Sequence, residues 1–141
     1  MYSKEESRKL RETFWTAFGK SFPKKWILYK TNIKGLSLKF HFDLKSAMVS
    51  MDIDSDLEQR VQLWEKLTGL KSILKEEYLP EAIFEDFYPM EHGKEVSRIY
   101  VRLKEVSIHN KNSWRETMEF FSTKMIQFEA FFTTYKDIID S

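Results

Sequence analysis

Cysteine is absent from this 141-residue sequence, which excludes disulfide bonds and metal sites built on thiolates. Glycine and proline are scarce, with four and three residues, so the chain has neither a glycine-rich phosphate loop nor a flexible linker. No hydrophobic run is long enough to cross a membrane, and the first residues are charged. We therefore expect no membrane partner and a cytoplasmic location.

Material for a hydrophobic core is plentiful, because 42% of the residues are apolar and 16% are aromatic. This composition and length predict one folded domain over residues 1–141. The net charge of +1 favours no class of partner, but no acidic residue lies between Thr13 and Phe42, where six lysines fall. These lysines could form a basic face for a phosphate backbone or an acidic partner, or they could mix with the later acids on the folded surface.

Helix and strand patterns alternate along the chain. Capping boxes of the form Ser-x-x-Glu at Ser3, Ser55 and Ser113 predict three helix starts, and Pro23 and Pro80 follow the first two helices. Five segments read as strands, namely residues 26–31, 36–42, 47–53, 82–88 and 95–103. The order α-β-β-β-α-β-β-α predicts an α+β domain with a mixed or antiparallel sheet of about five strands and helices packed on it.

The last helix has two apolar stripes. One stripe has alternating spacings of three and four residues and holds Trp114, Met118, Phe121, Met125, Phe128, Phe132, Tyr135 and Ile139. The second stripe holds Phe120, Phe131 and Ile138. A helix with two apolar stripes must be covered on two sides. The sheet is one cover, and the other is either a second helix of this chain or a second copy of the protein, which would form a homodimer.

Three aspartates, Asp52, Asp54 and Asp56, alternate where a strand gives way to a helix. They match positions one, three and five of a calcium loop, but such a loop needs glycine and glutamate where this chain has Leu57 and Leu63. The last two aspartates are better explained as helix-start residues, which cap free N–H groups and complement the helix dipole. Asp52 lies on the strand and is not explained in this way.

The order of elements also suggests a nuclease fold with the site pattern PD-(D/E)XK, in which two acids hold a metal and a lysine orients water. The pattern is incomplete, because the strand that carries Asp52 contains no lysine. A hydrolase centred on Asp52, with Asp43 and either Lys39 or Lys45 in support, is therefore the alternative hypothesis only. We predict no catalytic residue, no metal site and no cofactor.

One polar constellation lies on the strand at 95–103, where Arg98, Tyr100 and Arg102 share a face. Arginines that flank an aromatic ring can bind phosphate or carboxylate groups through forked hydrogen bonds. The simpler explanation is a solvated face whose charges pair with Glu85 and Glu95 across the hairpin.

A second constellation is Trp26 and Lys30, which alternate on one face of the segment 26–31 with Tyr29 on the other. Aromatic rings between lysines can stack on nucleic-acid bases. The alternative is that the aromatic residues belong to the core at a strand edge.

Taken together, these segments resemble domain of unknown function family 4268, a bacterial family, over nearly the whole chain. The resemblance depends on "LRETFWTAFG" at 10–19, "WILYKTNIKGLSLKF" at 26–40, "AMVSMDI" at 47–53, the helix at 56–78, "GKEVSRIYVRL" at 93–103, and "SW" at 113–114. Short single-domain members from Bacteroidetes look most similar.

The resemblance implies little about activity. Longer members look like a nuclease-type domain followed by this module, which implies an accessory role near DNA, in restriction or phage defence. Family members often carry an acid at the position of Asp52. They tend to have glycine at the position of Asn32, and asparagine tolerates the same left-handed backbone.

Our leading hypothesis is a non-enzymatic α+β module that binds a protein partner or a nucleic-acid backbone. The expected binding residues are Lys30, Arg98, Arg102, Tyr100 and Trp26. A homodimer through the last helix is compatible with either kind of partner.

Overall fold

The computed structural model describes residues 2–141 and combines one antiparallel sheet with α-helices, so the chain has an α+β fold. The helices are α1 (Lys4–Ser21), α2 (Leu57–Gly69), α3 (Lys71–Glu77) and α4 (Trp114–Ile139), with short 3₁₀ turns η1 (Glu91–Gly93) and η2 (Lys111–Ser113). The strands are β1 (Leu36–Phe42), β2 (Ser46–Ile53), β3 (Ile83–Pro89) and β4 (Glu95–Lys104), in the spatial order β1-β2-β4-β3.

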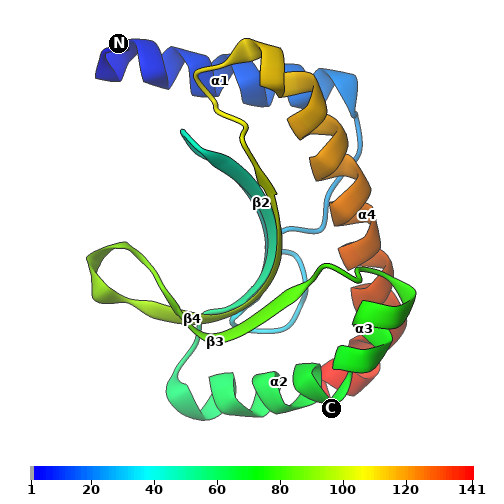
Figure 1. Ribbon diagram of the computed structural model, residues 1–141. Coiled ribbons are helices and arrows are strands. Elements are labelled where there is room, and N and C mark those ends of the chain that lie inside the picture. Colours follow the sequence, from blue (N-terminus) through cyan, green and yellow to red (C-terminus); the bar gives the residue numbers. More distant parts are fainter. Residues whose placement is uncertain (1) are drawn as a thin grey trace.

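The register of the sheet separates an apolar face from a polar one. Leu38 pairs with Met51, and Met51 pairs with Ile99, which places these three core residues in one row. The next position along β2 and β4 pairs Asp52 with Arg98 on the opposite face, because successive side chains of a strand alternate. Figure 1 shows the sheet as a strongly curved layer, with the helices of the described chain around its convex side.

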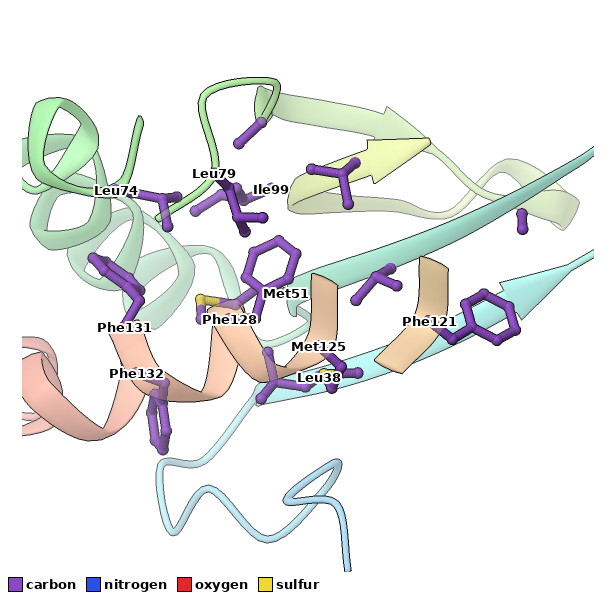
Figure 2. Close-up of a cluster of buried hydrophobic side chains, with 14 of the residues drawn as sticks. Leu38, Met51, Leu74, Leu79, Ile99, Phe121, Met125, Phe128, Phe131 and Phe132 are labelled. Carbon is purple, nitrogen blue, oxygen red and sulfur yellow. The ribbon is translucent and has the colours of Figure 1, made fainter. Parts of the chain in front are cut away.

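Helix α4 supplies much of the core on the apolar face of the sheet. Phe121, Met125 and Phe128 are fully buried in the same core cluster as Leu38 and Met51 (Figure 2). The second stripe of α4 has a more varied environment. Phe131 is fully buried and its ring lies 5.7 Å from that of Tyr78, just after α3, whereas Ile138 remains 51% exposed. Part of the second apolar stripe of α4 is therefore covered by this chain's own helical layer. The homodimer stays a prediction.

The sheet has four strands rather than the predicted five, because residues 26–31 form a turn and not a strand. Leu28 has a positive φ of 48°, and the N–H of Lys30 donates to the carbonyl of Ile27 at 2.8 Å. An extended strand cannot contain a residue with this φ. One backbone bond links this segment to β1, from the N–H of Leu38 to the carbonyl of Leu28 at 3.0 Å, and the Thr31 hydroxyl donates to the carbonyl of Leu36 at 2.8 Å. The apolar run in this segment therefore reflects partial burial of a loop.

Two helix predictions also need correction. The predicted helix at 56–78 is two helices, because the chain breaks at Leu70 between α2 and α3. Asp56 rather than Ser55 caps α2, accepting the N–H of Gln59 at 2.9 Å. Ser113 makes no capping bond to α4, since its hydroxyl donates to two preceding carbonyls instead.

Other local predictions are confirmed. The Ser3 capping box is complete on α1, and β3 and β4 form the expected hairpin. Asn32 has the left-handed φ of 61° that the comparison with glycine-bearing family members implied. Within the described residues, no helix is both long and apolar enough to cross a membrane.

Candidate binding surface

The polar face of the sheet is organised around a buried ion pair between Asp52 and Arg98. Arg98 donates from Nε to Oδ1 of Asp52 at 2.8 Å and from Nη2 to Oδ2 at 2.7 Å. Asp52 is 0% exposed and Arg98 only 2%. Burial alone would lower the pKa of Arg98, but its hydrogen bonds and charge interaction with Asp52 outweigh this and raise the pKa. Lys39 adds a third charge, with Nζ 3.6 Å from Asp52.

His41 and Ser50 lie beside this pair, with Nε2 of His41 2.9 Å from the Ser50 hydroxyl oxygen. That separation matches a nucleophile and its base, so it requires consideration as a catalytic pair. Two observations oppose this interpretation. Ser50 is 0% exposed, and burial together with the charge of Arg98 lowers the pKa of His41 to about 4, which makes it a weak base at neutral pH.

Tyr100 and Arg102 continue the polar face toward β3. The hydroxyl of Tyr100 donates to Glu85, and burial with this bond raises the pKa of Tyr100 to about 12. The guanidinium of Arg102 lies 5.1 Å from the Tyr100 ring centroid and donates to the Tyr88 hydroxyl at 2.9 Å. Tyr100 is therefore a 4%-exposed component of a hydrogen-bonded network, while Arg102 remains open to solvent.

Asp43 and Asp54 have local partners of their own. Asp43 accepts the N–H groups of Lys45 and Ser46, each at 2.8 Å, which closes the turn between β1 and β2. Asp54 lies 2.9 Å from Nζ of Lys94. Among residues 2–141, no cluster of three or more acids and histidines has the arrangement of a metal site.

A different surface lies along the outer edge of β1, and sequence reasoning did not find it. It consists of Trp15, Tyr29, Lys34 and Lys39, and we call it the β1-edge surface. Tyr29, Lys34 and Lys39 line a hollow of about 390 Å³ together with residues 32–37 and Asp54. Trp15, Tyr29 and Lys39 line an adjoining hollow of about 410 Å³, whose other lining residues are Leu28, Leu38, Phe40 and His41.

Tyr29, like Lys39, lines both hollows. Its ring is 73% exposed, the highest value among the exposed large hydrophobic side chains, and Nζ of Lys39 lies 5.8 Å from the ring centroid. Trp15 is 36% exposed while it stacks on Phe121 of the core, with ring centroids 5.6 Å apart. The sequence signals for this surface were the absence of acids from residue 13 to residue 42 and the aromatic residues between lysines at 26–31, which include Tyr29.

Helix α4 fixes the position of the loop that carries Tyr29. Glu129 is 7% exposed and accepts the backbone N–H of Ile27 at 2.6 Å through Oε2, while Oε1 lies 3.3 Å from Nζ of Lys24. A buried carboxylate that binds a loop amide holds the backbone in place. The exposed ring of Tyr29 therefore sits two residues from an anchored point.

The five residues expected to bind a partner divide among three places. Trp26 packs against Phe18 and Phe40 on the helical side of the sheet, with ring centroids 6.3 and 5.5 Å away. Arg98, Tyr100 and Arg102 share the polar face of β4, as predicted, and the first two are buried in its hydrogen-bonded network. Lys30 is exposed next to Tyr29 but lines neither hollow.

A protein-family profile described as "Domain of unknown function (DUF4268)" matches residues 10–136. The chain belongs to this family. The match includes all four residues of the β1-edge surface. No curated protein and no solved structure matches the chain. The fold of this DUF4268 member follows from its own residues, and its function is inferred from its surfaces.

Proposed function

We propose that this DUF4268 chain is a non-enzymatic module that binds the backbone of a nucleic acid through the β1-edge surface. The observation that carries the proposal is the position of Tyr29, a 73%-exposed aromatic ring beside two lysines at the junction of two hollows. Lysines supply charge for phosphates, and an exposed ring supplies a surface for bases or sugars.

The charge around this surface supports an anionic ligand. The segment from residue 13 to residue 42 contains six lysines and no acid. Asp54 is the one acid that lines the hollow at Lys34, and Lys94 lies 2.9 Å from it. In addition, the N–H groups of Lys34 and Gly35 make no hydrogen bond within residues 2–141, so they are free to donate to a phosphate.

A metal-dependent hydrolase centred on Asp52 has less support. Both carboxylate oxygens of Asp52 accept from Arg98, and its side chain is 0% exposed. Asp43 closes its own turn with two backbone bonds. To hold a metal, Asp52 would have to give up the pair with Arg98 and leave an uncompensated buried charge.

The proposal is tested by fluorescence anisotropy of labelled DNA across a salt series, with Lys34→Ala and Lys9→Ala compared with the unmodified protein. Both variants remove one exposed lysine, but Lys9 lies on α1 outside the β1-edge surface. Lys34→Ala should weaken binding and reduce the slope of log K against log salt by about 0.7 to 0.9. Equal slopes for both variants, or no binding at low salt, would reject the proposal.

A further inference from the structure

We propose that the preferred ligand of the β1-edge surface is single-stranded nucleic acid, with one base stacked on Tyr29 and its neighbour in the hollow beside Trp15. This inference depends on the proposed function and names the ligand class for the same surface. The reasons are the small number of lysines, the exposed aromatic rings and the free backbone groups of β1.

The charge available here is too small for tight binding of a duplex backbone. A protein that relies on phosphates makes about 6–10 contacts. The two hollows provide only Lys34 and Lys39, and Lys39 also lies 3.6 Å from the buried Asp52. Stacking adds about 1–3 kcal/mol for each base, a contribution that is available only when bases are unpaired and accessible.

Two aromatic side chains meet the requirement for stacking. Tyr29 and Trp15 both line the hollow of about 410 Å³, which is within the size range of small-ligand pockets. Lys39 lines the same hollow and can contact a phosphate that joins two bases. A tyrosine that is 73% exposed contributes little to the core, so the fold does not require an aromatic ring at this position.

The outer edge of β1, whose residues 38–41 line this hollow, has backbone groups that are not paired with another strand. The N–H of Leu38 points away from β2, because it donates to the carbonyl of Leu28. The bonding direction alternates along a strand, so the N–H and C=O of Phe40 also point outward. Neither group has a partner outside the strand among residues 2–141. A base or an extended peptide could use these groups, and the lysines favour the nucleic acid.

The turn that carries Tyr29 shows backbone strain. Leu28 has a φ of 48°, which is unfavourable for a leucine, by about 1–2 kcal/mol. The bond from Leu38 to the carbonyl of Leu28 and the bond from Ile27 to Glu129 hold this conformation. Strained residues that the surrounding structure holds in place are concentrated at binding sites. These bonds hold the turn with Tyr29 exposed in the unliganded protein.

The test compares a labelled oligothymidylate with a duplex of the same length, using Tyr29→Ala, Tyr29→Phe and Phe87→Ala. Phe87 is a matched control because it is 64% exposed but lies on β3. Single strands should bind more tightly than duplex. Tyr29→Ala should weaken single-strand binding about fivefold or more, while Tyr29→Phe and Phe87→Ala should bind within twofold of the unmodified protein.

The outcomes separate this inference from the function on which it depends. In one outcome, single strands and duplex bind equally, Tyr29→Ala has no effect and Lys34→Ala weakens binding. This result would overturn the inference and leave the backbone-binding function standing. No binding of either DNA at low salt would overturn both. Binding of polyglutamate alone, with loss in Tyr29→Ala, would also overturn both and identify the surface as a site for an acidic extended peptide.

Discussion

Asp52 and Arg98 stand opposite each other on β2 and β4 and are joined by two hydrogen bonds of 2.8 and 2.7 Å with both side chains buried. This pair joins the two inner strands of the sheet on its polar face. A buried pair of this kind specifies the register of its two strands, since a slip of either strand by one residue would move its charge to the apolar face and leave the other charge without its partner.

Asp52→Ala should lower the free energy of unfolding by about 3–5 kcal/mol, because it leaves the Arg98 guanidinium buried without a partner. The double variant Asp52→Ala/Arg98→Met should lose less than the sum of the two single variants, since it removes both charges. Urea unfolding measures all four proteins. A loss below about 1 kcal/mol in Asp52→Ala would contradict a structural role and make the hydrolase hypothesis the better one.

The lowered pKa of His41 should make the free energy of unfolding depend on pH. Its pKa is about 4 in the folded protein against an ordinary value of 6.5, so the unfolded chain binds more protons between these values. The contribution of His41 to the free energy of unfolding should therefore be fully present above pH 6.5. It should fall by on the order of 3 kcal/mol as the pH drops toward 4. His41→Gln should remove this part of the pH dependence. Parallel curves for both proteins between pH 7 and pH 4.5 would disprove the prediction.

Gly35 and Gly19 give a matched pair of alanine substitutions. Gly35 has a φ of 84°, and a Cβ there would lie 2.7 Å from the Cβ of Ser55, so Gly35→Ala should destabilise the protein by about 1–3 kcal/mol. Gly19 lies in α1 with nothing within 4 Å of an added Cβ, so Gly19→Ala should stabilise it by about 0.5–1 kcal/mol. Thermal unfolding measures both, and shifts of the same sign would be inconsistent with the turn described here.

Loss of the Glu129 carboxylate should loosen the loop that carries Tyr29. Glu129→Ala removes the acceptor for the N–H of Ile27, which should cost about 1–3 kcal/mol and speed hydrogen exchange at that amide. Glu119→Ala is the control, because Glu119 lies on the same helix in an exposed pair with Arg115. Unchanged exchange at Ile27 in the Glu129 variant would show that the loop is held by other contacts.

The sequence predicted the fold class, the β3–β4 hairpin and the position of α4 from periodicity, turn and capping signals and the order of elements. It failed at residues 26–31, where "WILYKT" has the composition of a strand but Leu28 takes a left-handed conformation. Propensity cannot show this, because the bonds from Leu38 and to Glu129 that hold the turn come from distant segments.

The candidate site was harder to predict than the fold for a related reason. Arg98 and Tyr100 were correctly placed on one strand face, yet the register brings Arg98 against Asp52 and the hairpin brings Tyr100 to Glu85. The alternation of side chains along a strand predicts the face on which a residue lies. It does not predict which charges on that face are already paired. The β1-edge surface depends on the strained turn, so Tyr29 could not be assigned to it from spacing.

The central claim, that nucleic acid binds at the β1-edge surface, is tested most directly by amide NMR of ¹⁵N-labelled protein titrated with oligothymidylate at low salt. We expect shift changes concentrated at residues 28–40 and near Trp15, which saturate with the oligonucleotide and disappear when the salt concentration is raised. Shift changes concentrated instead around Arg102 and Tyr88, or none at saturating oligonucleotide, would contradict it.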